Sequence, residues 1–164
     1  MRIVALTTVA LLASASAALA APASVEVRLS PAMQAKAEKT YGVRDVNEIA
    51  ADLQRTVERR LAKTGAYDGA RIQLTLVDAV PNRPTMKQMF DKPGLSFQSF
   101  GIGGAEITGQ AIAADGTVTP LGYKWYEQDI REAARAAGPW QDAQWTMQRF
   151  ADRLGRGDAV ARRD

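Results

Sequence analysis

Cysteine and histidine are both missing from the 164 residues of this chain. Without cysteine, no disulfide forms, the fold must be held by packing, and we expect no acylated-cysteine lipid anchor. Without histidine, the commonest general base, the Ser–His and Cys–His nucleophile pairs and all imidazole metal ligands are lost. Together these absences remove the usual ligands of structural zinc. We therefore expect no cofactor, no metal site and no enzymatic activity.

The excess of positive over negative charge is also small. The formal net charge is only +3, of which Arg2 contributes one, and charged residues make up 24% of the chain. This excess is too small to indicate nucleic acid or an anionic membrane as a partner. The apolar content of 46% is ordinary for a globular protein, and the length suits one domain.

The first twenty residues have the three parts of a secretory signal peptide. Arg2 is followed by an apolar run from Ile3 to Leu12 and by Ala18-Leu19-Ala20. The order predicts cleavage after Ala20 and a periplasmic or secreted protein without an integral membrane span. The alternative is a retained anchor, because the segment approaches the length of a membrane span, but its second half is only weakly apolar.

Residue periodicity predicts secondary structure over residues 21–155. Alternation over 24–29 predicts a strand, and Ser30-Pro31 then opens a short helix. An apolar stripe predicts a long helix that begins at Asp45, where Glu48 completes a capping box. The remaining elements are a strand over 70–78, a Gly-rich extended segment over 96–113, its hairpin partner over 117–126 and a final helix over 140–154.

This strand–helix–strand–hairpin–helix order predicts a single α+β domain over residues 21–155. We expect a mostly antiparallel β-sheet with the two main helices packed on one face. The Arg-rich residues 156–164 are expected to form a disordered basic tail.

The segment 81–94 carries most of the candidate binding residues. Three prolines exclude a regular strand there, and connections of this length are often functional. Met86, Met89 and Phe90 either fold back onto the core or form a partner-binding tip.

Three charged residues near that segment are further candidates. Asp78 lies an even number of residues from the apolar residues of its strand, so it should face the same side as they do. This places Asp78 at the rim of the core, where Arg83 could pair with it. Glu106 lies among glycines on the polar face of a neighbouring strand. Two carboxylates can perform acid–base chemistry, as in glycoside hydrolysis, unless they lie more than about 10 Å apart.

Several short motifs together resemble a family of uncharacterised envelope proteins of Gram-negative bacteria, many of them outer-membrane lipoproteins. The motifs are Ile-Gln-Leu-Thr-Leu over 72–76, Gly-Gly-Ala-Glu-Ile-x-Gly over 103–109, the Asp115-Gly116 hairpin and a closing helix with Trp140, Asp142, Ala143, Phe150 and Ala151. The resemblance implies a helix-backed sheet and a non-enzymatic envelope role, and it brings no catalytic residues. The chain departs from the lipoprotein members because it lacks their anchor cysteine.

We therefore predict a periplasmic binding or accessory module whose partner is another envelope protein or envelope component. The speculative contact residues are Asp78, Arg83, Met86, Met89, Phe90 and Glu106. Two alternatives stay open at this point. One is a carboxylate-based hydrolase of envelope glycans that uses Asp78 and Glu106, and the other is a purely structural protein with no pocket beside the proline segment.

Overall fold

The structure is a computed structural model that describes residues 21–158, and the proposed signal peptide therefore lies outside the described residues. Of the expected basic tail, residues 156–158 are described and form a turn closed by an Arg156–Asp158 ion pair, while the rest of it also lies outside. The described chain is α+β, with a four-stranded sheet, five α-helices and one π-helical turn. Its elements are β1 (Ser24–Leu29), α1 (Pro31–Lys36), η1 (Ala37–Tyr41), α2 (Val43–Thr64), β2 (Arg71–Val80), α3 (Met86–Asp91), β3 (Gly104–Ile112), β4 (Val118–Tyr126), α4 (Ile130–Arg135) and α5 (Gln141–Gly155).

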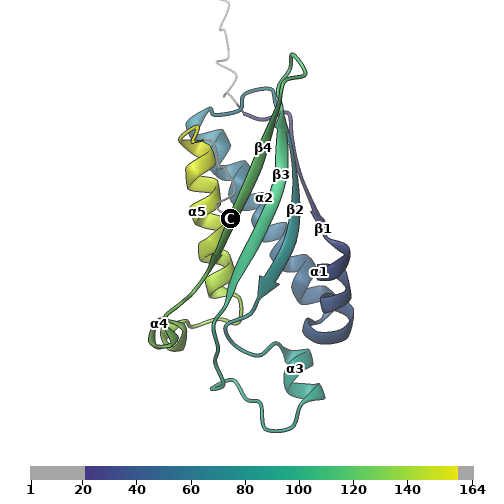
Figure 1. Ribbon diagram of the computed structural model, residues 1–164, viewed down its shortest axis with the longest axis vertical. Helices are drawn as coiled ribbons and strands as arrows, with labels where there is room; N and C mark the ends of the chain where they lie inside the picture. The colour runs from purple at the N-terminus through teal and green to yellow at the C-terminus, as the bar shows by residue number, and fades with distance from the viewer. Residues whose placement is uncertain (1–20, 159–164) are drawn as a thin grey trace, which may run out of the picture.

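The sheet has the strand order β1-β2-β3-β4, and it is mixed: antiparallel pairs are in the majority, as predicted, but one pair is parallel. β2, β3 and β4 form an antiparallel meander, but β1 pairs with β2 in parallel. The helices between β1 and β2 carry the chain back along the sheet, so that β2 starts at the same end as β1. The two long helices, α2 and α5, cover one face of this sheet, as expected (Figure 1).

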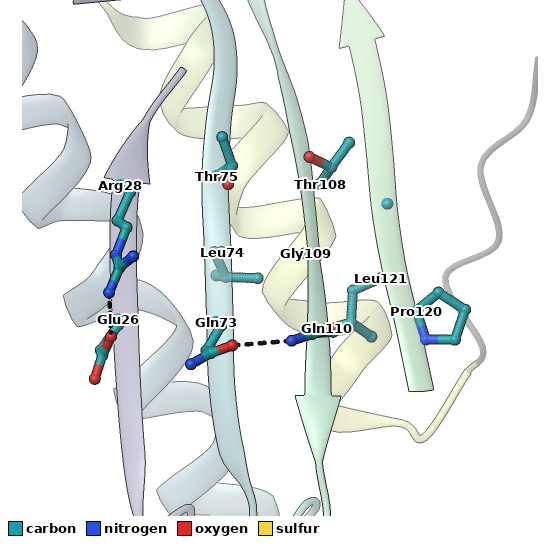
Figure 2. A pocket seen from close by; sticks show the side chains of 11 residues that line it. Glu26, Arg28, Gln73, Leu74, Thr75, Thr108, Gly109, Gln110, Pro120 and Leu121 are labelled. Carbon is teal, nitrogen blue, oxygen red and sulfur yellow. Dashed lines mark hydrogen bonds and ion pairs between the residues drawn. The ribbon is translucent and has the colours of Figure 1, made fainter. Parts of the chain in front are cut away.

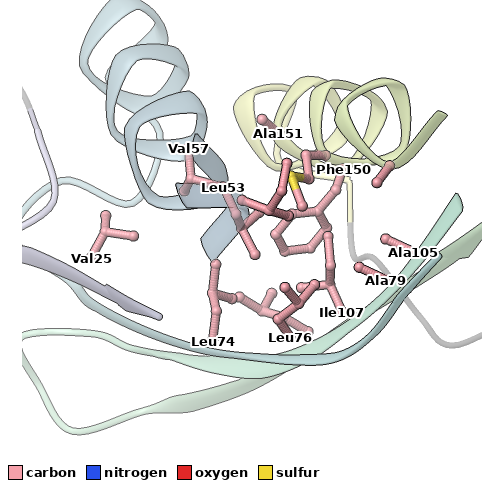
Figure 3. Close-up of a cluster of buried hydrophobic side chains, with 14 of the residues drawn as sticks. Val25, Leu53, Val57, Leu74, Leu76, Ala79, Ala105, Ile107, Phe150 and Ala151 are labelled. Carbon is pink, nitrogen blue, oxygen red and sulfur yellow. The ribbon is translucent and has the colours of Figure 1, made fainter. Parts of the chain in front are cut away.

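The core lies between that face and the two helices. The large side chains of the expected stripe of α2 are buried, and so is the stripe of α5, where Phe150 and Leu154 have no exposed surface. Figure 3 shows Leu53 and Phe150 from the helices meeting Leu74, Leu76 and Ile107 from the sheet. Burial of such side chains is worth about 1.5–3 kcal/mol each, which compensates for the absence of disulfides.

The long helix α2 begins and ends at glycines. Gly65 at its carboxyl end has a φ of +71°, the left-handed conformation typical of a helix stop. At the other end the helix starts at Val43, directly after Gly42, which has a φ of +102°. The predicted capping box is therefore wrong, because the chain turns at Gly42 and Asp45 already lies inside the first helical turn.

Two predicted boundaries near the proline segment also differ from the structure. The segment is not irregular throughout, because Thr85 and Gln88 form a capping box that starts the short helix α3. The Gly-rich strand begins only at Gly104, and residues 96–103 belong to the connection. A further short helix, α4, lies between β4 and α5. Within residues 21–158, none of the helices has the length and apolarity needed to cross a membrane.

Candidate functional site

The connection between β2 and β3 is the most exposed apolar part of the described chain. Figure 1 shows α3 and the loop after it beyond the lower end of the sheet. Phe90 is 93% exposed, Phe97 68% and Met86 65%. We call the exposed large apolar side chains of this connection the apolar tip: Met86, Phe90, Phe97, Phe100 and Ile102.

The sequence left open whether Met86, Met89 and Phe90 fold back onto the core or form a partner-binding tip, and the structure decides between these alternatives. Met86 and Phe90 lie four residues apart on α3 and both point away from the core, while Met89 is half-buried. The side chains of Met86 and Phe90 therefore form a tip. Phe97, Phe100 and Ile102 were not singled out in the sequence, although their apolar character in a Gly- and Ser-containing segment was the available signal.

A buried polar cluster fastens both ends of this connection to the start of α5. Asn82, where the connection leaves β2, is fully buried and its side-chain amide donates to the Gly138 carbonyl oxygen over 2.9 Å. Its amide oxygen accepts from the backbone N–H of Asp142 over 3.2 Å. Asp142 in turn accepts from the backbone N–H of Gly103, where the connection returns to β3, over 3.1 Å. We call these four residues the clasp.

The clasp carries one uncompensated carboxylate oxygen. Oδ1 of Asp142 is buried and has no hydrogen-bond partner in the described part of the chain. Burial raises the pKa of this carboxyl, and the charge of Glu127 acts in the same direction, while the hydrogen bond from Gly103 opposes them. The folded protein therefore binds a proton at Asp142 more tightly than an exposed aspartate does.

Arg83 fixes the connection from its outer side and does not pair with Asp78. Its guanidinium donates to the carbonyl oxygens of Ala136 over 2.6 Å, Ala134 over 2.9 Å and Phe97 over 3.1 Å. The predicted ion pair with Asp78 is therefore wrong, because the Arg83 guanidinium donates instead to carbonyl oxygens at the end of α4. Arg83 ties the connection to α4, so it positions the apolar tip rather than forming part of it.

Asp78 does not have the parity that the sequence suggested. A β-bulge between Leu76 and Asp78 adds one residue to β2, and this extra residue turns Asp78 onto the outer face. There it lies opposite Glu106 in the antiparallel register, with Cα atoms about 4.5–5.5 Å apart. The structure therefore brings together the two carboxylates whose proximity the sequence left open.

Both carboxylates are already engaged. Asp78 accepts from Nζ of Lys36 over 2.7 Å and from the Tyr126 hydroxyl over 2.7 Å, one partner on each oxygen. Glu106 forms an ion pair of 3.1 Å with Lys124. Burial and the bond to Asp78 raise the pKa of Tyr126 far above its ordinary value, and that same carboxylate raises the pKa of Lys36. Both groups therefore stay protonated as donors to Asp78.

The outer face of the sheet is polar and carries a shallow hollow of about 700 Å³. Figure 2 shows its side chains on all four strands, with the helices behind the sheet. Gln110 donates to Gln73 across the strands over 2.9 Å, and Arg28 pairs with Glu26 over 3.5 Å. The hollow lies at mid-sheet, so no residue of the 81–94 segment lines it. Nowhere in residues 21–158 are three acidic side chains grouped as a metal site would need.

Comparison with known proteins adds no functional label to this geometry. No protein-family model matches the chain, and no curated protein matches it. The resemblance to Gram-negative envelope proteins accordingly remains a prediction from the sequence motifs.

Proposed function

We propose that the protein is an exported, non-enzymatic binding module of the cell envelope whose contact surface is the apolar tip. The single observation that carries the proposal is the exposure of five large apolar side chains on one connection of the fold. Contiguous exposed apolar surface on a globular domain is typical of an interaction site. Export and the envelope as compartment rest on the signal-peptide pattern of residues 1–20.

The way in which the tip is held supports the same proposal. A loop whose apolar side chains had no role would gain stability by folding them onto the core. Here the clasp and Arg83 hold the connection by buried polar contacts that leave those side chains outside. A rigid base under exposed aromatic side chains lowers the entropy lost on binding, which is how contact surfaces gain affinity.

The proposal is tested by site-specific photo-crosslinking in the native envelope. A photoreactive phenylalanine analogue replaces Phe90 in one variant and the exposed Asn47 of α2 in the control. We expect a defined crosslinked product from position 90 and none from position 47. A Phe97→Ser change in the crosslinking variant should weaken that product about tenfold or more, because burial of one phenylalanine is worth about 1.5–3 kcal/mol.

Equal crosslinking from positions 90 and 47 would contradict the proposal, and so would a product that Phe97→Ser leaves unchanged. Because Phe97 is 68% exposed, its replacement should not alter the free energy of unfolding by more than about 0.5 kcal/mol. Urea denaturation of the variant therefore separates a lost contact from a lost fold.

The glycan hydrolase remains the alternative, and its supporting observation is the facing register of Asp78 and Glu106. It is the weaker candidate because both oxygens of Asp78 already accept hydrogen bonds. If it were correct, Glu106→Gln would abolish release of soluble glycan from purified cell-wall material while leaving the crosslink from position 90 intact. Absence of release by the unaltered protein removes the alternative.

A further inference from the structure

A line of one aromatic and two cationic side chains lies on α5 beside the edge strand β4. Trp145, Arg149 and Arg153 follow one another at intervals of four residues, so they lie along one side of the helix. All three are exposed, Trp145 to 38%. Figure 1 shows α5 next to β4, with α3 beyond the lower end of the sheet.

Both guanidinium groups lie over aromatic rings of β4. The Arg149 guanidinium carbon lies 4.0 Å from the centroid of the Trp125 ring, and that of Arg153 lies 4.9 Å from the centroid of Tyr123. Tyr123 and Trp125 are two residues apart on one strand, so their rings repeat at about 6–7 Å. The cation–π contact uses the positive charge of each group and needs none of its N–H donors, which stay available for a ligand.

Neither of these arginines has an acidic partner in the part of the chain that the structure describes. Among residues 21–158, no ion pair or side-chain hydrogen bond involves Arg149 or Arg153, whereas Arg60, on the neighbouring helix α2, pairs with Asp152 over 3.2 Å. Because the rings beneath them repeat at about 6–7 Å, the two like charges lie close enough to repel each other. A doubly charged anion placed between them would neutralise both, while a single carboxylate would neutralise only one.

We propose that Arg149 and Arg153 form a phosphate-binding site, with Trp145 as the adjacent surface for the group that carries the phosphate. A phosphate monoester or diphosphate carries close to two negative charges and offers oxygens that match the planar donors of two guanidinium groups. The site is independent of the apolar tip, because it uses α5 and β4 and shares no residue with the β2–β3 connection.

The test is a titration of the purified protein with inorganic pyrophosphate, followed by tryptophan fluorescence and calorimetry. Trp125 and Trp145 border the site, and binding should therefore change the fluorescence in a saturable manner. We expect Arg149→Gln and Arg153→Gln each to raise the Kd about tenfold or more, because each removes a charge-assisted, bidentate contact. Arg149→Lys keeps the charge but not the planar donors, and it should restore only part of the affinity.

The matched control is Arg131→Gln, which removes one exposed positive charge from α4. It should leave the Kd unchanged. A loss in this control equal to that in the site variants would overturn the proposal by showing general charge attraction. Site variants that bind as tightly as the unaltered protein would overturn it as well.

A second arm distinguishes the two sources of such a phosphate. Phosphatidylcholine vesicles with and without phosphatidic acid are sedimented with the protein and with Arg149→Gln. Pyrophosphate binding that depends on both arginines assigns the site to soluble phosphates, and arginine-dependent sedimentation with phosphatidic acid alone assigns it to lipid headgroups. Binding to neither probe refutes the site.

Discussion

Replacement of Asn82 by alanine tests whether the clasp fastens the β2–β3 connection. The change removes the donor to the Gly138 carbonyl and the acceptor of the Asp142 N–H, at a residue with no exposed surface. Each stranded backbone group costs about 1–3 kcal/mol when it stays buried. Because Gly138 is only half-buried and water can reach its carbonyl, we expect a loss of about 2–4 kcal/mol in the free energy of unfolding.

Such a loss is a large part of the free energy of unfolding of a domain, which is usually about 5–15 kcal/mol. It should lower the Tm by about 6–12 °C for a domain of this size. Urea denaturation followed by circular dichroism measures the free energy, and limited proteolysis reports the local effect. Because Asn82 holds the connection in particular, cleavage within residues 83–102 should rise more than cleavage elsewhere.

The matched control is Asn47→Ala, the same chemical change at an exposed position in α2. It should be neutral or stabilising by a few tenths of a kcal/mol, because alanine is the better helix former. The reasoning is refuted if Asn82→Ala costs less than about 1 kcal/mol, or if the control costs as much.

Two further variants probe the carboxylates. Since burial raises the pKa of Asp142 in the folded protein, the folded state binds the proton more tightly, and stability should fall as pH rises from the ordinary aspartate value, about 4, to the raised one. Asp142→Asn should remove that fall and be the more stable protein at pH 7, as urea midpoints between pH 4 and 7 would show; parallel curves would contradict this. Tyr126→Phe, which deletes the 2.7 Å bond to Asp78, should cost about 1 kcal/mol. It should leave the phenolate absorbance up to pH 11 unchanged, because the raised pKa keeps Tyr126 un-ionised there; a clear decrease would refute that shift.

Local patterns predicted the main elements well. The apolar stripes of α2 and α5 and the hairpin at Asp115-Gly116 are where the sequence places them. These features depend on neighbours a few residues apart, so the sequence alone contains the information.

The pairing of the strands across the sheet could be predicted from the sequence only in part. The sequence contains the long helical crossover between β1 and β2, which is the signal of a parallel pair, yet the order of elements was interpreted as a mostly antiparallel sheet. The bulge in β2 has no local signature, and a single extra residue was enough to reverse the side of Asp78. The facing of Asp78 and Glu106 therefore could not be derived from residue parity.

The sequence by itself determined which chemistries are available, since no arrangement of the chain can supply a thiol or an imidazole that it does not contain. It also determined the two long helices and most of the strands, whose periodicity is local. Only the tertiary structure decided that Met86 and Phe90 face outward, that Asn82 and Asp142 fasten the connection, and that Arg149 and Arg153 lie on rings of β4. These relations join residues up to 60 positions apart, and they arise from packing and from the pairing of buried polar groups, which no local pattern records.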